Sequence, residues 1–228
     1  GGLGTTSSAN VGAYNLTDTS QGTLILANGP SGANQGLASN YTLTGGTQDY
    51  TITQRVLSSS GSKAYDANTN ALAADITLSN LVSGETLNHS GTASISSANA
   101  ASYTITNLAG ITLADNAGLA SNYTLTGGTH NFTVNPKVIS LSGSRLYDAT
   151  TDAVASDLTT ISGLVGSETL NLSGTGSVTN ANVASNKTVT LGTLALADNS
   201  GLAANYTLSG GTHQLTINQR PCLLYTSD

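Results

Sequence analysis

Short runs in which apolar and polar residues alternate recur along the chain, with the period of two that a strand with one buried face requires. Tyr41-Thr42-Leu43-Thr44 alternates in this way, and Gly45-Gly46 follows as a hairpin signal. A second alternating run follows each of three such places, through Tyr50 and Ile52, Phe132 and Val134, and Leu215 and Ile217. The residue types change while the parity holds, so we expect these positions to face a core.

Further strands are predicted at short intervals, and convincing 3.6-residue periodicity is absent. The predicted segments are Val56–Ser60, Ala73–Ser79, Glu85–His89, Ala93–Ser97 and Ser102–Asn107. About one strand in every 12 residues is the spacing of an all-β module. We therefore predict β-sandwich or β-grasp-like modules, with a β-solenoid as the alternative. A helical turn over Ala71-Leu72-Ala73-Ala74 is a further alternative.

The alternating phrase belongs to a tandem repeat. Residues 36–46 recur unchanged as 118–128 and return with two differences as 201–211. Their tyrosines, Tyr41, Tyr123 and Tyr206, are 82 and 83 residues apart. A fixed period of this kind defines an array, and this one is longer than the roughly 20–47 residues of most solenoid repeats. We expect the three tyrosines to occupy equivalent positions, packed against the cores of small, independently folded domains.

Other landmarks in the same phase set the repeat boundaries. Tyr65-Asp66-Ala67-Asn68 recurs as Tyr147-Asp148-Ala149-Thr150, and Arg55, Lys137 and Arg220 mark the seams. We divide the chain into an incomplete repeat over 1–54, complete repeats over 55–136 and 137–219, and a seam and tail over 220–228. The first repeat lacks its start and carries seven extra residues around Gly29–Asn34. Short seams leave little linker, so we expect the repeats to stack end to end in an elongated array.

The composition excludes several classes of function. Six basic residues against twelve acidic ones give a net charge of −6, with no basic patch for nucleic acid. No apolar run approaches the roughly 18 residues of a membrane span. Low charge, few aromatics and abundant Thr, Ser, Asn and Gly favour an exported surface protein. The chain starts with Gly-Gly, so we interpret it as an internal fragment whose lack of a targeting segment is uninformative.

The tail from Cys222 to Asp228 departs from the repeat phase. It resembles the translation of a transposase-type sequencing adapter, because TGT CTC TTA TAC ACA TCT GAC encodes those seven residues. The alternative is the genuine start of another repeat. On the adapter interpretation the natural chain continues beyond Arg220 or Pro221, the tail contributes nothing to function, and no disulfide holds the array together.

Candidate catalytic residues are few. His130 and His213 share a repeat position at which the first copy has Gln48, and a catalytic histidine would not be exchanged in this way. We interpret that position as a polar residue at a strand edge. No nucleophile elbow, zinc-binding helix motif or phosphate loop is present. Lys63 aligns with Arg145, which cannot form an isopeptide bond, so no covalent crosslink is expected. The sequence predicts neither an enzyme nor a cofactor.

Calcium is a weak candidate. Residues 66–70 have the D-x-N-x-N spacing of a calcium loop but lack its central glycine and its final carboxylate. The second copy keeps only an alternation that ends at Asp152. Asx turns account for these residues equally well. The calcium candidates are Asp66, Asp148 and Asp152. Several Asn-x-Ser/Thr sequences leave glycosylation as a minor hypothesis.

The order of these motifs resembles the YDG-type, MBG-related repeats of large bacterial surface adhesins and filamentous-haemagglutinin-like exoproteins. The resemblance rests on Tyr-Asp-Ala-(Asn/Thr)-Thr, Ser-Gly-Glu or Ser-Glu before Thr-Leu, Asn-Val or its equivalent, and Asn-Tyr-Thr-Leu, and it covers about 1–220. In that family the first motif is typically Tyr-Asp-Gly-Thr. Ala67 and Ala149 stand at the glycine, so we expect no obligatory left-handed residue there.

The resemblance implies secretion by an outer-membrane route, a location on the bacterial cell surface and a role in an adhesive stalk, without catalysis. Our leading hypothesis is a structural spacer whose partners are the neighbouring repeats of the same chain. The alternative is a set of modules that bind host glycan or mucin directly. Exposed aromatic residues on loops would favour that alternative, but aromatic residues make up only 4% of the chain.

Overall fold

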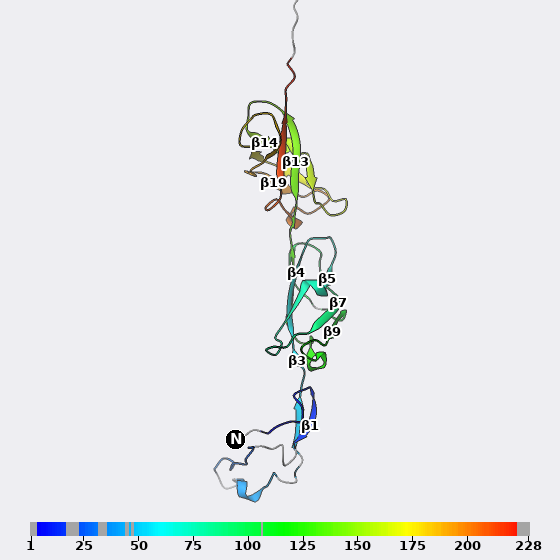
Figure 1. The fold of residues 1–228 in the computed structure, drawn as a ribbon, viewed down its shortest axis with the longest axis vertical. Helices are drawn as coiled ribbons and strands as arrows, with labels where there is room; N and C mark the ends of the chain where they lie inside the picture. The colour runs from blue at the N-terminus through cyan, green and yellow to red at the C-terminus, as the bar shows by residue number, and fades with distance from the viewer. Residues whose placement is uncertain are drawn as a thin grey trace, which may run out of the picture. The chain divides into compact units, whose positions relative to one another are not determined.

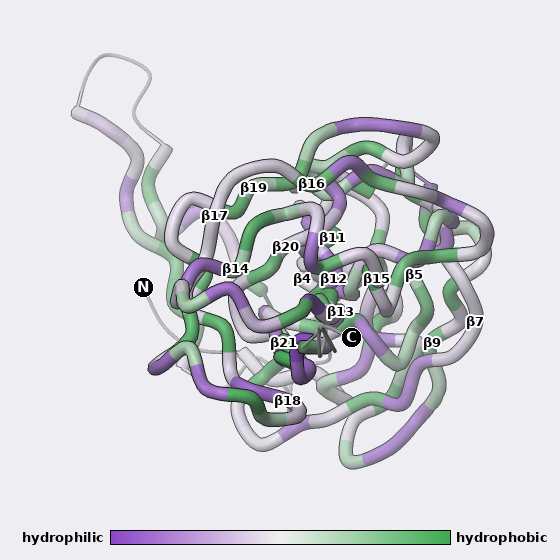
Figure 2. Tube along the Cα trace, turned by 90° about the horizontal axis from the view of Figure 1, so that it is seen from above, coloured by the Kyte–Doolittle hydropathy of each residue, from purple (hydrophilic) through white to green (hydrophobic). Residues whose placement is uncertain are grey.

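The computed structural model describes residues 4–16, 23–31, 36–43, 46, 48–105 and 107–222. Within these ranges the chain is all-β (Figure 1), with short strands and single turns of 3-10 helix and no α-helix. Hydrophobic and hydrophilic stretches alternate along the backbone trace in Figure 2. The fold class predicted from the sequence is therefore confirmed, and the described strands form open sheets rather than the coils of a solenoid.

The elements follow the chain in three groups. The first repeat contains β1 (Gly12–Leu16), η1 (Ala38–Asn40) and β2 (Gln48–Ile52). The middle repeat contains β3 (Arg55–Val56), β4 (Ser58–Ala64), β5 (Asn70–Leu72), η2 (Ala73–Asp75), β6 (Ile76–Ser79), β7 (Asn88–Ser94), β8 (Ala101–Thr104), β9 (Ile111–Ala114), η3 (Ala120–Asn122), β10 (Tyr123–Thr124) and β11 (His130–Asn135). The last repeat contains β12 (Lys137–Val138), β13 (Ser140–Leu146), β14 (Asp152–Val154), η4 (Ala155–Asp157), β15 (Thr160–Ser162), β16 (Asn171–Ser173), β17 (Thr175–Ser177), β18 (Ala184–Thr188), β19 (Ala195–Ala197), η5 (Ala203–Asn205), β20 (Tyr206–Thr207) and β21 (His213–Asn218).

The chain contacts define two compact units. The first comprises 1–59, 78–90 and 111–129, and the second comprises 60–77, 91–110 and 130–228. The middle repeat therefore contributes residues to both units, whereas the last repeat lies wholly within the second. The contacts described below are taken within one unit at a time.

The last repeat is built around a parallel pair of strands. β13 pairs in parallel with β21, and β15 and β18 flank this pair in antiparallel orientation, which gives the order β15-β13-β21-β18. Three two-stranded pairs complete the repeat: β14-β17, β16-β19 and the parallel pair β12-β20. The middle repeat has the corresponding four-stranded order, β6-β4-β11-β8, and the corresponding parallel pair β10-β3. The sequence period is thus a period of structure.

The core positions of the two complete repeats follow the predicted parity. In the second unit Phe132, Val134, Leu215 and Ile217 are buried, each pointing to the same face of its strand. In the first unit the core gathers Leu57, Leu87 and Tyr123, with leucines and an alanine packed around them. Burial of apolar area at about 25 cal/mol per Å² is the main contribution of such clusters to stability.

The same expectation is wrong for the first repeat, where Tyr50 is 53% exposed. Among the described strands its own strand, β2, pairs with β1 alone, in a two-stranded sheet. Among the described residues of this repeat no strand corresponds to β4, which covers Phe132 in the middle repeat. The difference comes from the incomplete repeat and not from the alternating pattern.

The hairpin predicted at the paired glycines does not form in the complete repeats. Gly127 and Gly210 have positive φ values of 86° and 84°, and a tight turn does follow each Tyr-Thr-Leu segment. The strands on either side do not pair with each other, because β20 pairs with β12 and β21 with β13 and β18. The glycines turn the chain from one sheet into another.

Some element boundaries also differ from the prediction. Ala73–Asp75 forms a single turn of 3-10 helix before β6, so the helical alternative holds for part of that segment. Glu85 lies before β7 rather than in a strand, and the strand over Ile111–Ala114 has no counterpart in the prediction. These segments are short, and their pairing is decided by contacts distant in sequence.

Candidate functional site

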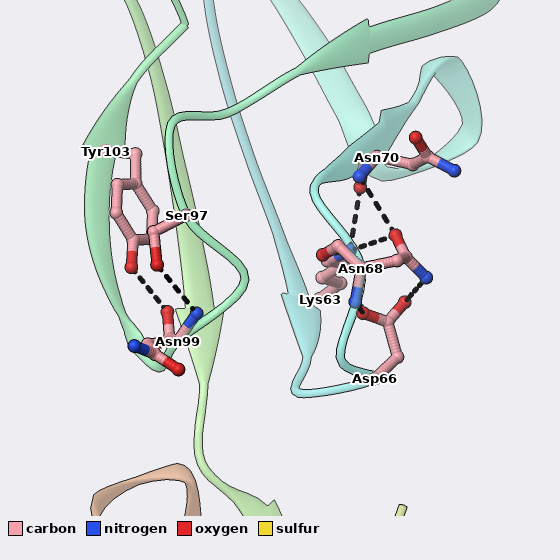
Figure 3. A network of polar contacts seen from close by, with 7 residues as sticks. All are labelled: Lys63, Asp66, Asn68, Asn70, Ser97, Asn99 and Tyr103. Carbon is pink, nitrogen blue, oxygen red and sulfur yellow. Dashed lines mark hydrogen bonds and ion pairs between the residues drawn. The ribbon is translucent and has the colours of Figure 1, made fainter. Parts of the chain in front are cut away.

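The Tyr-Asp-Ala motif of the middle repeat forms a turn that a lysine holds closed (Figure 3). Asp66 accepts a hydrogen bond from the backbone N–H of Asn68 at 3.1 Å, which is an Asx turn. The ammonium group of Lys63 lies 2.8 Å from Asp66 Oδ1 and donates to the backbone oxygens of Asn68 and Asn70 at 2.8 Å. Burial alone would raise the pKa of Asp66, but the hydrogen bonds from Lys63 and Asn68 outweigh it and lower that pKa.

The last repeat builds the same turn with an arginine. Arg145 pairs with Asp148 and donates to the backbone oxygen of Thr150 at 2.7 Å, and Asp148 accepts from the Thr150 N–H at 2.9 Å. That backbone hydrogen bond is the main cause that lowers the pKa of Asp148. The exchange of Lys63 for Arg145 therefore preserves a cation over the turn.

The calcium candidates occupy separate positions in these turns. The carboxylates of Asp66 and Asp148 each face the cation three residues earlier, and Asp152 is exposed at the start of β14. In the part of the chain that the structure describes, no group of three or more His, Cys, Asp or Glu side chains is placed to hold a metal ion. The absence of calcium binding stays a prediction.

The alanine that stands at the family's glycine adopts a left-handed conformation, contrary to our expectation. Ala67 has a φ of 61° and Ala149 a φ of 68°. For a residue with a Cβ, this conformation costs roughly 1–2 kcal/mol relative to the right-handed one. The hydrogen bonds that close the turn impose the conformation, so the replacement of glycine by alanine does not show that the turn is permissive.

Tyr65, at the start of this turn, reaches a glutamate of the last repeat within the second unit. Its hydroxyl donates to Glu168 Oε1 at 2.6 Å, and the hydroxyl of Tyr206 donates to Glu168 Oε2 at 2.6 Å. The two phenol rings meet edge to face, with centroids 5.4 Å apart. The Tyr206 oxygen also accepts the backbone N–H of Val165 at 3.0 Å. We call this cluster of Tyr65, Glu168 and Tyr206 the tyrosine joint.

The tyrosine joint is largely withdrawn from solvent, since Tyr65 and Tyr206 are each 5% exposed. Burial, with the hydrogen bond to Glu168 as the second cause, raises the pKa of Tyr65 to about 12. The same two causes raise the pKa of Tyr206. Both phenols therefore remain neutral donors to the carboxylate well above neutral pH.

An amide contact accompanies the tyrosine joint in the second unit. Asn205 Oδ1 accepts the backbone N–H of Ala100 at 2.8 Å, and Asn205 Nδ2 donates to Asn99 Oδ1 at 3.0 Å. Tyr103 donates to the Asn99 carbonyl at 2.6 Å and Ser97 accepts the Asn99 N–H at 3.2 Å, so Asn99 is fixed from both sides (Figure 3).

The position of Asn205 in this contact is fixed by η5, a single 3-10 turn. Asp198 accepts the N–H of Ala203 at 2.7 Å, and Asn205 donates its own N–H to the carbonyl of Leu202 at 3.0 Å. These bonds set the 3-10 turn that presents Asn205 and Tyr206 side by side in the chain. We call the Asn205, Asn99 and Ala100 contact the amide contact.

The first unit contains the same amide contact at the preceding seam. Asn122 Oδ1 accepts the N–H of Val11 at 2.9 Å, and Asn122 Nδ2 donates to Asn10 Oδ1 at 2.9 Å. Tyr14 and Ser8 hold Asn10 as Tyr103 and Ser97 hold Asn99. The same amide contact is therefore present at two separate seams between neighbouring repeats.

Glu85 and Tyr123 in the first unit correspond to Glu168 and Tyr206. Tyr123 donates to Glu85 Oε2 and accepts the N–H of Val82 at 3.2 Å. Burial and the hydrogen bond to Glu85 raise the pKa of Tyr123. No described residue donates to Glu85 Oε1, the atom whose counterpart in Glu168 accepts from Tyr65. A pocket of about 290 Å³, lined in part by Asn10, Glu85 and Tyr123, opens beside the pair.

The three phrase tyrosines divide into two kinds. Tyr123 and Tyr206 are buried as predicted, but Tyr41 is 69% exposed. The glutamate lies 38 residues before the tyrosine in both complete repeats. In the first repeat, with its seven extra residues, that position would precede residue 1. The described part of the first repeat contains no glutamate that could pair with Tyr41.

The shared histidine position has a structural role. His213 is buried at the first residue of β21, a strand that lies inside its sheet between β13 and β18, so the polar residue expected at a strand edge belongs to a central strand. Its Nδ1 accepts the N–H of Leu141 at 3.2 Å, so its Nε2 carries the proton and donates to the Leu208 carbonyl at 2.8 Å. Gln48 donates to the Leu43 carbonyl at 3.0 Å, the equivalent bond in the first repeat. The exchange of histidine for glutamine keeps this donor.

The residues of the two contacts were not singled out by the sequence analysis. No role was predicted for Glu168, Asn205 or Asn99. Their signal was present, because each recurs in the repeat phase as Glu85, Asn122 and Asn10. Polar residues of constant type at constant spacing, in copies whose other polar residues change, point to a contact between copies.

Of the tail, only Pro221 and Cys222 lie within the described residues, and Cys222 is exposed.

The fold and these contacts define a tandem-repeat protein of small all-β modules that touch through conserved polar positions of the repeat. Comparison with family models gives two matches to the YDG domain, over residues 53–131 and 129–214. The matches span most of the chain, and the chain belongs to the YDG domain family. Searches of curated proteins and of solved structures found no match. No helix in the described ranges is long and apolar enough to cross a membrane.

Proposed function

We propose that these repeats are spacer modules of a secreted bacterial surface adhesin, which hold a distal binding region away from the cell. Membership of the YDG domain family supports the proposal, as does the low charge of the chain. The role is mechanical, and it requires neither a cofactor nor a reaction. The polar groups at the seam satisfy one another, which suits a permanent contact better than a site that must turn over.

The observation that carries the proposal is the pair of contacts in the second unit. A spacer transmits distance only if successive modules keep a fixed orientation, and flexible linkers lose reach because their span grows only as the square root of their length. The tyrosine joint and the amide contact attach the last repeat to the middle repeat at several atoms. Directional hydrogen bonds of this kind fix an orientation as well as a distance.

Surface display tests the proposal. The chain is placed between a bacterial outer-membrane anchor and a distal receptor-binding tag, and adhesion to receptor-coated beads is measured. Spacer function predicts adhesion that falls when 137–219 is deleted and returns when an unrelated rigid spacer of similar length replaces it. Adhesion that depends on the YDG repeats themselves and is not restored by the unrelated spacer would contradict the proposal.

A binding function is the second candidate, and one observation favours it. Tyr41 and Tyr50 of the first repeat are exposed, and Tyr50 lines a pocket of about 490 Å³ with Leu24 and Ile52. Aromatic faces are suited to stack against sugar rings. Binding of the full chain to immobilised mucin, lost on Tyr50→Ala and kept on Tyr147→Ala, would support direct recognition. Equal binding of the parent chain, Tyr50→Ala and Tyr147→Ala to mucin would contradict direct recognition by Tyr50.

A further inference from the structure

The last repeat presents a second copy of the surface that the middle repeat uses. Tyr147 occupies the repeat position of Tyr65, and the N–H of each donates to an asparagine carbonyl at 2.9 Å, Asn218 and Asn135 respectively. The same backbone bond therefore holds both tyrosines at the end of the corresponding strand. Their exposure differs, because Tyr65 is 5% exposed against Glu168 and Tyr206 while Tyr147 is 39% exposed.

The asparagine that accompanies the tyrosine is also repeated. Asn182 occupies the position of Asn99 and is exposed. Asn180 accepts its N–H at 3.1 Å and Lys187 donates to its carbonyl at 3.0 Å. The lysine thus takes the part that Tyr103 plays for Asn99. The sequence has changed around Asn182 while the two bonds that fix its backbone have been kept.

The matching surface is found on the middle repeat, in the first unit. There the amide contact is complete, but Glu85 Oε1 receives no hydrogen bond from any described residue, and the pocket of about 290 Å³ lies beside it. In the second unit the corresponding place is filled by the ring of Tyr65. The described residues therefore contain one assembled tyrosine joint, one exposed tyrosine at the position of Tyr65, which is Tyr147, and one glutamate without that tyrosine, which is Glu85.

We propose that Tyr147, together with Asn182, is a docking surface for a further YDG repeat, whose glutamate and tyrosine receive the Tyr147 phenol. The Glu85–Tyr123 pocket is the receiving surface of the same kind, which takes the tyrosine of a Tyr-Asp-Ala or Tyr-Asp-Gly motif. The occupant is another module of this family, because the equivalent surfaces already fit each other in the tyrosine joint. There the Tyr65 hydroxyl and the Tyr206 hydroxyl each donate to one oxygen of Glu168. This inference concerns module recognition and does not depend on where the protein is displayed.

Chemical modification of the tyrosines tests the proposal. A copy of residues 138–219, with the tyrosine of its own Tyr-Asp-Ala motif changed to phenylalanine, is fused directly after Arg220 of the full chain in place of 221–228. Nitration by tetranitromethane is followed by peptide mass spectrometry. Tyr41 serves as the exposed reference and Tyr65 as the protected one in every protein.

In the unextended chain Tyr147 should react and Tyr65 should not. In the extended chain nitration of Tyr147 should slow by at least about tenfold, as for other groups that become reachable only by local opening. A control chain extended by a Gly/Ser-rich tail of equal length should show no slowing. Unchanged reactivity of Tyr147 in the chain extended by a repeat would overturn the proposal.

A second measurement covers the case in which nitration itself disturbs the surface. Tyr147→Ser should leave the thermal midpoint of the unextended chain almost unchanged and lower that of the extended chain. Changing the copy's equivalent of Glu168 to leucine should also lower the midpoint of the extended chain, and by less in the Tyr147→Ser background than in the parent, because only the bond to its own repeat's tyrosine then remains to be lost. Equal effects of Tyr147→Ser in both chains would show that Tyr147 has no partner in the added repeat.

Discussion

Tyr65→Phe removes one hydrogen bond from the tyrosine joint and leaves the ring in place. The Tyr65 hydroxyl donates to Glu168 Oε1 at 2.6 Å, and the ring packs edge to face on Tyr206. Phenylalanine keeps that packing, so the change isolates the hydroxyl. Tyr147→Phe is the matched control, because it removes a hydroxyl at the same repeat position from a tyrosine that is 39% exposed.

The expected loss follows from the kind of bond. A hydrogen bond to a charged group contributes about 1.5–3 kcal/mol, more than a neutral one, because the carboxylate is left poorly solvated when the donor is removed. Tyr65 is 5% exposed, so water replaces the lost donor with difficulty. We expect Tyr65→Phe to lower the free energy of unfolding by about 2 kcal/mol, and Tyr147→Phe to change it by less than about 0.5 kcal/mol.

Urea denaturation of the full chain, followed by far-UV circular dichroism, measures both variants. The chain contains no tryptophan, so tyrosine fluorescence is a second probe of the joint. With a urea dependence near 2 kcal/mol per molar, the expected loss moves the midpoint of the affected transition by about 1 M. In a repeat array the loss appears in the interface between neighbours, so the transitions of the two repeats should separate.

Equal losses in Tyr65→Phe and Tyr147→Phe would refute this reasoning, because only the Tyr65 hydroxyl has Glu168 as its partner. A double-mutant cycle with Glu168→Gln gives the same answer independently. The tyrosine joint predicts a coupling energy between positions 65 and 168 of about 1 kcal/mol or more. Additive effects would show that the Tyr65–Glu168 hydrogen bond does not account for the loss of stability.

Three further predictions test other parts of the structure. Ala149→Gly should raise the free energy of unfolding by about 0.5–1 kcal/mol, because it relieves a left-handed alanine at the cost of a more flexible unfolded chain; urea denaturation showing a loss would contradict this. His213→Gln should stay within about 1 kcal/mol of the parent since glutamine keeps the bond to the Leu208 carbonyl, whereas His213→Leu should lose about 2–3 kcal/mol; thermal unfolding that ranks them the other way would be inconsistent with the donor role. Since the pKa of Tyr65 rises from 10.0 to about 12 on folding, its stabilisation is present below pH 10 and is lost as the pH rises toward 12. Discounted for solvent screening, this stabilisation is about 1–2 kcal/mol. The stability that Tyr65→Phe loses should therefore shrink over that window in a pH series of unfolding midpoints.

The fold class could be predicted because it depends on local patterns. Alternation places Phe132, Val134, Leu215 and Ile217 in the core, and the period of 82 or 83 residues marks a structural unit. The order of the strands could not be predicted, because β13 and β21 pair in parallel across about seventy residues of chain. The paired glycines illustrate the limit, since they do turn the chain but send it into a different sheet.

The contact between repeats was only partly open to prediction. Short seams predict that neighbouring repeats are partners, but they do not show that Glu168 and Asn205 make the contact. The left-handed conformation of Ala67 does not follow from its residue type, because the Asx turn and the Lys63 hydrogen bonds determine the backbone there. The buried place of His213 could not be predicted from its residue type, because its two backbone partners lie 72 and 5 residues away in sequence.

Small-angle scattering of the full chain tests the spacer proposal most directly, compared with the double variant Tyr65→Ser, Asn205→Ala. A compact single domain of this length would have a radius of gyration of roughly 17 Å. The spacer proposal predicts a value well above that for the parent, and a scattering profile of the variant that shows greater flexibility. A compact parent, or a variant indistinguishable from it, would contradict the claim that these contacts hold successive repeats in a fixed, extended order.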